Sequence, residues 1–397
     1  MFLKRTAPVG VVFVVLAVAV VLPYARGPVY RFPPSVPFAG LTLLNPYATL
    51  GDTWQRANLH AHGRVWSGLT NGRRQSDEEI IRAYRSFGYS VAGVSDYQHI
   101  AAFDGVDTLP IYEHGYNIGK RHQLAIGARD VSWFDFPLGQ TRSHQQFVID
   151  RVGSSADLVA LAHPSSRDGY TPEDLAELTR YHLIEVVNGP FRYEEAWDAA
   201  LSAGRTVWAL GNDDTHDLDD LKRSAMAWTM INAASPALPD VVDALRSGRA
   251  YAVSRSNEIA SAVDTRLGRV TLDGDTLTVT CAGEPSTFIF VGQLGAIRKT
   301  VYNTLSASYA FAREDTYIRT VIRSPRTAMF LNPVIRTDGD QPHAPVATVN
   351  IAGTWLFRAS IAIAGIALLV LYWERRRRPL GASEARPVLA QADRETA

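Results

Sequence analysis

Histidines and aspartates gather in five short motifs along the chain, and these residue types bind divalent metal ions. The motifs are Asn58-Leu59-His60-Ala61-His62, Ser95-Asp96, Asp130, His163-Pro164 and Asp214-Thr215-His216. Imidazoles and carboxylates are ligands that Zn²⁺, Mn²⁺ and Fe²⁺ share, and a His-x-His pair can present both rings to one ion from a strand end. The pattern therefore predicts the site of a metal-dependent hydrolase.

The spacing of the motifs indicates how the fold could bring them together. His60, Asp96, Asp130 and His163 follow one another at intervals of about 35 residues, close to the roughly 30 residues that a strand, a crossover and a helix occupy. Most of the motifs come directly after a short apolar run. Because the carboxyl ends of parallel strands meet at one rim, we expect the motifs to form a single site.

The segments between the motifs alternate between strand-like and helix-like patterns. Short apolar runs predict strands at 57–60, 90–94, 123–126, 158–162, 183–187, 206–210 and 225–231. Helices are predicted from the capping box at Ser76 to Gly88, from Thr171 to about Tyr181, at 194–202 and at 238–247. The alternation predicts an α/β fold with a parallel β/α barrel over residues 50–255.

The pattern changes beyond Val253 to period-two alternation and turns. Residues 270–281, with Asp273-Gly274-Asp275 at their centre, predict a hairpin, and further strands are predicted at 287–291, 316–323 and 327–331. We therefore expect a small, sandwich-like all-β domain over residues 256–342. This region holds no cluster of His or Cys, so we expect it to serve packing or partner contact.

Composition excludes some classes of function. The chain has 397 residues and a formal net charge of +0, so no charge excess indicates a polyanionic partner, and we expect no nucleic-acid binding. Its one cysteine, Cys281, excludes an intrachain disulfide. The fold must therefore depend on its apolar core, with bound metal as a further candidate source of stability.

Both ends of the chain resemble membrane segments. Residues 7–23 carry no charge and follow Lys4 and Arg5, which predicts an N-terminal anchor at 1–27, or alternatively a cleaved signal peptide. A second apolar stretch at 351–374 precedes a tail at 375–397 that begins with four arginines and that we expect to be disordered. The positive-inside rule then predicts two spans in the cytoplasmic membrane, with both termini cytoplasmic and the main domains on the outer, periplasmic side.

The five motifs, taken in order, resemble those of the polymerase and histidinol phosphatase (PHP) superfamily, over roughly residues 60–253. The resemblance implies a metal-dependent phosphoesterase on a distorted seven-stranded, TIM-like β/α barrel with two or three metal ions. The chain departs from the family pattern at four places. Asn58 stands for an Asp, and Ser67-Gly68 lacks the acid of a Ser-Asp-Gly. Tyr97 follows Asp96 where a His is usual, and Asp130 stands where the family has a bridging Glu.

The resemblance also implies a set of ligands and catalytic groups. Metal ligands are expected at His60, His62, Asp130, His144, His163, Asp214 and His216. Catalytic roles are expected for Asp96, Asp130 and His99. Arg64 and Arg129 are cations suited to phosphate oxygens, with surface solvation as the alternative. His114, His122, His182 and His343 are left unassigned.

Three functions are compatible with these residues. The first is a membrane-anchored phosphoesterase that hydrolyses a small-molecule or lipid-linked phosphomonoester or phosphodiester with a metal-activated water. The second keeps the metal, which can be Zn, Mn or Fe, and changes the bond to an amide, carbamate or carboxyl ester. The third is a metal-stabilised binding module without catalysis.

Overall fold

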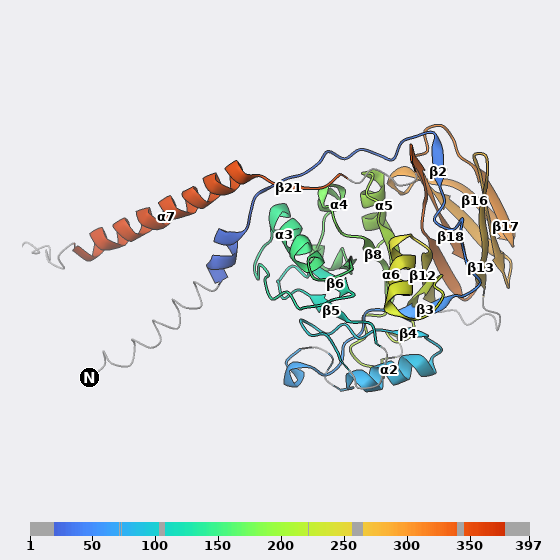
Figure 1. The fold of residues 1–397 in the computed structure, drawn as a ribbon, viewed down its shortest axis with the longest axis horizontal. Helices are drawn as coiled ribbons and strands as arrows, with labels where there is room; N and C mark the ends of the chain where they lie inside the picture. Colours follow the sequence, from blue (N-terminus) through green and yellow to red (C-terminus); the bar gives the residue numbers. More distant parts are fainter. Residues whose placement is uncertain are drawn as a thin grey trace, which may run out of the picture.

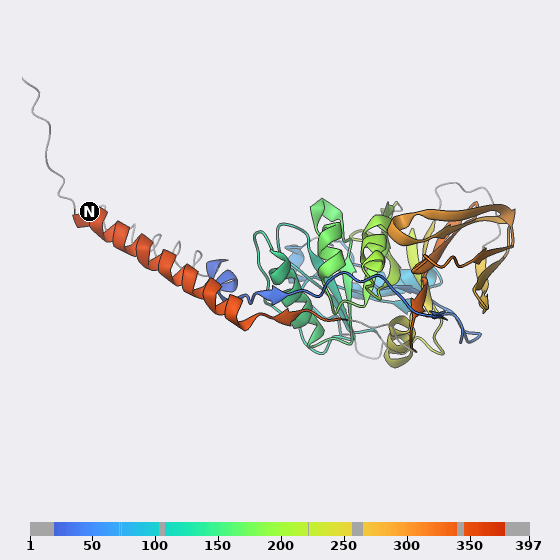
Figure 2. The same cartoon turned by 90° about the horizontal axis from the view of Figure 1, so that it is seen from above.

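The computed structural model describes residues 20–70, 72, 74–102, 108–220, 222–255, 265–339 and 345–377. A body of β-sheets and short helices forms most of the molecule, and the long helix α7 (Ile351–Arg377) projects away from it (Figures 1 and 2). The body divides into a part with helices, towards α7, and a part dominated by strands at the far end (Figure 1).

One sheet provides most of the strand ends that form the candidate site. Its order is β10-β8-β7-β6-β5, with β9 paired to β8. The strands are β5 (Ile111–His114), β6 (His122–Ile126), β7 (Leu158–Ala162), β8 (Leu183–Asn188), β9 (Phe191–Arg192) and β10 (Trp208–Asn212). Strands β7, β8 and β10 are parallel, whereas β6 runs antiparallel to both β5 and β7. The start of β6 and the ends of β5 and β7 therefore share one edge.

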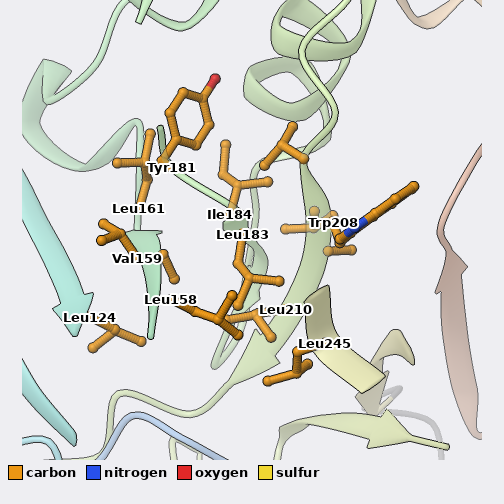
Figure 3. Close-up of a cluster of buried hydrophobic side chains, with 14 of the residues drawn as sticks. Leu124, Leu158, Val159, Leu161, Tyr181, Leu183, Ile184, Trp208, Leu210 and Leu245 are labelled. Atoms are coloured by element: carbon orange, nitrogen blue, oxygen red, sulfur yellow. The ribbon is translucent and has the colours of Figure 1, made fainter. Parts of the chain in front are cut away.

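This sheet is buried because its strands are apolar on both faces. Every residue of β6, β7, β8 and β10 is buried, as expected for strands covered on two sides. Leu124, Leu161, Ile184 and Leu210 are among the side chains that pack together there (Figure 3). The flanking helices are α3 (Arg142–Gly153), α4 (Pro172–Glu177) and α5 (Glu194–Ser202). Helix α3 packs on β6 and β7, and α5 packs on β8.

A second sheet of ten strands runs through the rest of the body. Its main order is β16-β15-β18-β19-β12-β11-β3-β4, and β20 joins β18 to β2. The bounds are β2 (Thr42–Leu44), β3 (Gln55–Asn58), β4 (Val91–Ala92), β11 (Ala227–Ile231), β12 (Ala250–Arg255), β15 (Ser286–Val291), β16 (Ile297–Thr304), β18 (Tyr317–Arg323), β19 (Thr327–Leu331) and β20 (Val334–Thr337). Helices α2 (Asp77–Ser86) and α6 (Leu238–Arg246) accompany it.

Smaller pairings complete the fold. A three-stranded antiparallel sheet contains β13 (Arg266–Asp273), β14 (Thr276–Ala282) and β17 (Ser306–Ala310). Strand β1 (Tyr30–Arg31) pairs with β21 (Thr348–Val349), so the chain that enters the body lies beside the chain that leaves it for α7.

The two large sheets meet at Gly211 of β10. Its N–H donates to the Thr229 hydroxyl, and that hydroxyl donates back to the Gly211 carbonyl, both over 2.9 Å. A Cβ atom at Gly211 would lie 2.5 Å from the Trp228 carbonyl oxygen. Only glycine permits this close approach, which brings the end of β10 next to β3 and the motif that follows it.

Several predicted elements are confirmed. Helix α2 has the capping box of Ser76 and Glu79, α5 has the predicted bounds, and α4 is shorter than expected, ending at Glu177. The hairpin around Gly274 is β13 and β14. Among the described residues the strands form open sheets and not a closed ring, and the TIM-like barrel stays a prediction. The division at residue 255 also stays a prediction, although β12 pairs with β19 across it.

The predicted membrane topology is corrected. Within the described residues, one helix is long and apolar enough to cross a membrane, over Ile351–Arg375. Most of the predicted N-terminal anchor lies outside the described residues, and its described end, residues 20–26, is a short helical segment. The two-span arrangement was wrong, because among the described residues this is the one helix that is long and apolar enough to span. The 27 residues of α7 extend about 40 Å, enough for a bilayer core of roughly 30 Å.

Candidate metal centre

Histidines and carboxylates from five strand ends converge at one edge of the six-stranded sheet. His60 and His62 follow β3, and Asp214 and His216 follow β10. Glu113 lies near the end of β5, His122 begins β6, and His163 comes directly after β7. Because β6 is reversed, its first residue faces the last residues of its neighbours: His122 pairs with Ala162 and His114 with Gln123.

The Glu113 carboxylate lies at the centre of this cluster. Its Oε1 atom is 2.7 Å from Nδ1 of His122 and 3.0 Å from Nε2 of His163. Its Oε2 atom is 3.2 Å from Nε2 of His62. Glu113 is fully buried, so one carboxylate is shared between imidazoles from three different strand ends.

Asp214 forms the second centre of the cluster. Its Oδ1 atom is 3.2 Å from Nε2 of His60, 3.3 Å from Nε2 of His62 and 3.4 Å from Nε2 of His216. The His60 and His62 Nε2 atoms are 3.2 Å apart. The two rings of the His-x-His pair therefore aim the same nitrogen at a common point.

Glu185, in the middle of β8, orients this cluster from beneath. Its Oε1 atom is 2.8 Å from Nδ1 of His60, and its Oε2 atom accepts the main-chain N–H of His163 over 2.7 Å. The side-chain amides of Asn188 and Asn212 each donate to it over 2.8 Å. Glu185 thereby fixes the His60 ring with Nε2 facing the cluster, which is how a buried carboxylate commonly supports a metal-binding histidine.

Asparagine side chains tie the two ligand-bearing loops together. Asn58 accepts the N–H of Asp213 over 2.9 Å, and Asn212 accepts the N–H of Leu59 over 2.7 Å.

Two candidate ligands also have an unusual backbone conformation: His163 and Asp214 have positive φ angles of 30° and 51°. Backbone conformations of this kind cost free energy in residues other than glycine and are concentrated at functional sites.

The electrostatics of the cluster are dominated by opposite charges in a dry environment. Burial by itself would lower the pKa of His60, but the carboxylates of Asp214, Glu185 and Glu113 outweigh it and raise that pKa well above its usual value. Burial would raise the pKa of Glu113, but His122 and His60 lower it well below its usual range. His216 differs, because burial and His62 lower its pKa to about 4.

The donor set fits divalent metal ions. Four overlapping sets of three side chains lie close enough to hold a metal ion. Two of the sets contain Glu113, one together with His60 and His62 and one together with His122 and His163. The other two contain Asp214, one together with His60 and His163 and one together with His62 and His216. Glu113 Oε2 and Asp214 Oδ1 are buried and make no well-formed hydrogen bond within the described residues, although imidazole nitrogens lie 3.2 Å from each. Buried acceptors seldom remain unpaired, and a cation would satisfy both of these.

Asp130 and Arg129 lie outside this cluster. Both follow β6, whose last residue Ile126 pairs with Leu158 at the start of β7, so they are at the opposite end of the sheet. Asp130 accepts the N–H of Val131 over 2.8 Å, and Arg129 pairs with Asp157 over 2.7 Å. The expectation that Asp130 bridges two ions assumed a parallel β6, and the reversal of that strand corrects it.

His144 and Arg64 are also placed outside the cluster. His144 is on helix α3. Its ring stacks on Phe136 with 4.1 Å between centroids and lies beside Tyr24. Burial lowers its pKa to about 4, as expected for an uncharged ring in an apolar setting. Arg64 is exposed, on the loop after His62.

Asp96 and His99 form a smaller group with Asp77 beside the main cluster. Asp96 is buried and accepts the N–H of Gly63 over 2.7 Å, next to His62. Its other oxygen is 3.9 Å from Nδ1 of His99, whose side chain is partly exposed. Burial and the nearby Asp77 raise the pKa of Asp96 to about 7. Asp96 thus positions the loop that carries His62.

The sequence patterns did not identify Glu113 and left His122 unassigned. The short strand β5 had not been predicted, and His122 had been set aside as a lone histidine. A signal was present, because His122 directly precedes the predicted strand at 123–126, and in a reversed strand the residue before the apolar run reaches the site.

Comparisons with known proteins add little to this geometry. No protein-family model matches the chain, and no curated protein matches it. Among solved structures, a two-domain protein from Bacteroides vulgatus that contains a predicted PHP-like metal-dependent phosphoesterase aligns with 80% of this chain and 98% of its own length. The identity is 14% and the TM-score 0.39, so this likeness is distant and the argument about function depends on the metal centre.

Proposed function

We propose that this protein is a metal-dependent phosphoesterase that hydrolyses a phosphomonoester or phosphodiester at this cluster. The observation that carries the proposal is the shared carboxylate of Glu113, whose two oxygens face different imidazoles: His122 and His163 on one side, His62 on the other. A carboxylate shared between two sets of imidazoles would help to hold a pair of divalent cations, which can activate a water for in-line displacement at phosphorus.

The donors divide naturally between two cations. His60, His62, Glu113 and Asp214 would hold one, and Glu113, His122 and His163 would hold the other. When bound, such cations lower the pKa of a water and neutralise charge on the attacking and leaving oxygens. Zn, Mn and Fe are all compatible with these nitrogen and oxygen donors.

Two further side chains can act on the substrate directly. Burial raises the pKa of the Tyr97 hydroxyl well above its usual value, and Glu113 and Asp214 raise it further, so the hydroxyl stays protonated and can donate to a phosphoryl oxygen. Its ring stacks on His62 at 4.5 Å between centroids. His216 is uncharged near neutral pH and can donate one hydrogen bond at the more exposed side of the cluster.

Metal content and turnover of the same sample test this proposal. Full-length protein in detergent should bind two divalent ions per chain and hydrolyse p-nitrophenyl phosphate or bis-p-nitrophenyl phosphate. Glu113→Gln should lose at least one ion and reduce kcat/KM by more than about 100-fold, since a bridging ligand matters more than its outer partners. Asp130→Asn is the matched acid-to-amide control and should behave as the wild type.

Three results would overturn the proposal. Metal-loaded protein with no turnover on any phosphoester would support a binding module, and faster turnover on matched carboxyl esters or amides would assign the metals to acyl hydrolysis. Equal losses in Glu113→Gln and Asp130→Asn would show that the cluster has been located wrongly.

A further inference from the structure

A cavity of about 580 Å³ opens directly beside the metal centre. Tyr97 and His122 belong to both, since each lines the cavity and also contacts the metal cluster. The outer walls are Trp66, Tyr116 and Trp133, and we call this space the aromatic vestibule. A group attached to a phosphate held at the metal centre would extend into it.

The aromatic walls are exposed but held in place. Trp66 is 44% exposed, Tyr116 49% and Trp133 59%. The Trp66 and Trp133 rings meet edge to face with centroids 5.6 Å apart, Trp66 Nε1 donates to the Tyr97 carbonyl over 2.8 Å, and the Tyr116 hydroxyl donates to the Trp133 carbonyl over 2.9 Å. Fixed, solvent-facing aromatic rings around a concave space are typical of a ligand site.

Lys120 supplies a positive charge at the wall of the vestibule, beside Tyr97. Its ammonium nitrogen is 5.8 Å from the centroid of the Tyr97 ring. Lys120 also lines the cavity. A compact cation at this position suits a phosphate oxygen that points away from the metal ions.

Gln98 provides an independent sign that the vestibule takes a ligand. Its side chain is 6% exposed and lines the cavity. Its Nε2 donates to the Ser132 carbonyl over 3.0 Å, which fixes the amide, while its Oε1 has no partner within the described residues. A buried acceptor without a partner costs free energy unless a donor from a ligand reaches it.

We propose that the aromatic vestibule binds the leaving group of the phosphoester, and that this group is a planar aromatic ring bearing an N–H or O–H donor. The inference rests on the proposed phosphoesterase function and specifies its substrate class. Three aromatic rings line the outer wall, and stacked or edge-to-face contact between rings adds to the burial of apolar area. The Gln98 oxygen then accepts from the ring substituent, and Lys120 meets the phosphate.

Non-hydrolysable phosphonates measure this preference without turnover. Metal-loaded full-length protein would be titrated calorimetrically with methylphosphonate, heptylphosphonate, benzylphosphonate and 4-aminobenzylphosphonate. We expect benzylphosphonate to bind about 10-fold more tightly than methylphosphonate and more tightly than heptylphosphonate, and the amino group to add about another 5-fold. An alkyl compound that binds as tightly as the benzyl one would overturn the proposal in favour of an acyl chain.

Two variants test which side chains cause the preference for a ring-bearing phosphonate. Trp133→Ala should reduce the benzyl-to-methyl ratio to below about 3-fold, and Gln98→Leu should remove only the gain from the amino group. Tyr302→Ala is the matched control, because Tyr302 is an aromatic residue 73% exposed on β16, in the strand-rich part of the body. An unchanged ratio in Trp133→Ala would refute the vestibule.

The two proposals fail differently. Ring-selective binding without hydrolysis of any phosphoester would retain the vestibule and remove the phosphoesterase. Hydrolysis without any preference between rings and alkyl chains would retain the enzyme and remove the vestibule.

Discussion

Two buried charge clusters within the described residues differ in how completely their polar groups are paired. In the first, Arg319 of β18 donates to both oxygens of Asp198 over 2.7 and 2.6 Å and to Glu194 over 2.9 Å. The Tyr317 hydroxyl donates to the same Asp198 over 3.0 Å. Each of these donors reaches a carboxylate oxygen, so this cluster joins α5 to the second sheet.

The metal centre has the opposite character. Carboxylate oxygens and imidazole nitrogens face one another, and Glu113 Oε2 and Asp214 Oδ1 make no well-formed hydrogen bond among the described residues. Buried acceptors without a hydrogen bond cost free energy, and a cation held between them would remove that cost. The contrast separates a buried charge that is structural from one that is arranged for a cation.

Breaking the cluster of Arg319 and Asp198 should have the largest effect on the free energy of unfolding. Arg319→Met leaves the buried Asp198 carboxylate uncompensated, and we expect a loss of about 3–5 kcal/mol in the free energy of unfolding. Denaturant melts of the purified protein measure it. Arg319→Met with Asp198→Asn removes the lone charge and should recover part of the loss, whereas metal content per folded chain should not change in either variant. A cost below about 1 kcal/mol would mean that the pair is not buried as described.

Removing metal should destabilise the other cluster. Cation at 100 to 1,000 times its Kd should stabilise the folded protein by about 2.7–4.1 kcal/mol, and a chelator should remove that gain. Thermal melts with and without Zn²⁺ or Mn²⁺ provide the measurement. Glu113→Gln should show a smaller metal-dependent shift in Tm, and Arg319→Met an undiminished one. A Tm that does not respond to either cation would contradict metal binding at the centre.

Weakening the support of the metal centre should have an intermediate effect. In Glu185→Gln the acceptor of His60 Nδ1 becomes uncharged, and we expect metal affinity or activity to fall by about 10- to 100-fold. Metal titration and kcat/KM at saturating metal distinguish a positioning role from general loss of structure, because excess metal should restore most of the activity. Wild-type affinity in this variant would mean that Glu185 does not orient His60.

His182 offers a smaller test, because it directly precedes β8 and lies outside both clusters. Its Nδ1 accepts the N–H of Val159 over 3.2 Å, and burial, followed by Arg246, lowers its pKa to about 4. Below about pH 6.5 the unfolded chain binds a proton at His182, whereas the folded chain does not. The stabilisation that the uncharged His182 gives to the folded protein is therefore complete above about pH 6.5 and is lost as the pH falls towards about 4.

The wild type should therefore lose about 2 kcal/mol more than His182→Gln between pH 7 and pH 5. The glutamine oxygen can still accept from Val159. Chemical denaturation at each pH gives the difference, and parallel curves for the two proteins would show that His182 does not titrate between these values.

Local patterns in the sequence were sufficient for many elements. The capping box at Ser76, the helix at 194–202 and the hairpin at Gly274 depend on residues close together in the chain, and each formed as expected. His60, His62, His163 and Asp214 were also identified from their residue types and from their places after apolar runs. Asp130 was placed wrongly because the direction of a strand within a sheet is not encoded in its own residues.

The sequence by itself determined the chemistry of this protein, since the imidazoles and carboxylates that can bind a cation are fixed by residue type and by their positions at the ends of apolar segments. Only the tertiary structure decided which of them meet. Strand β6 runs against its neighbours, and that reversal brings His122 to the edge occupied by Glu113 and His163 while it carries Asp130 to the opposite edge. Strand pairing is a long-range interaction, so its direction is chosen by the packing of the whole sheet.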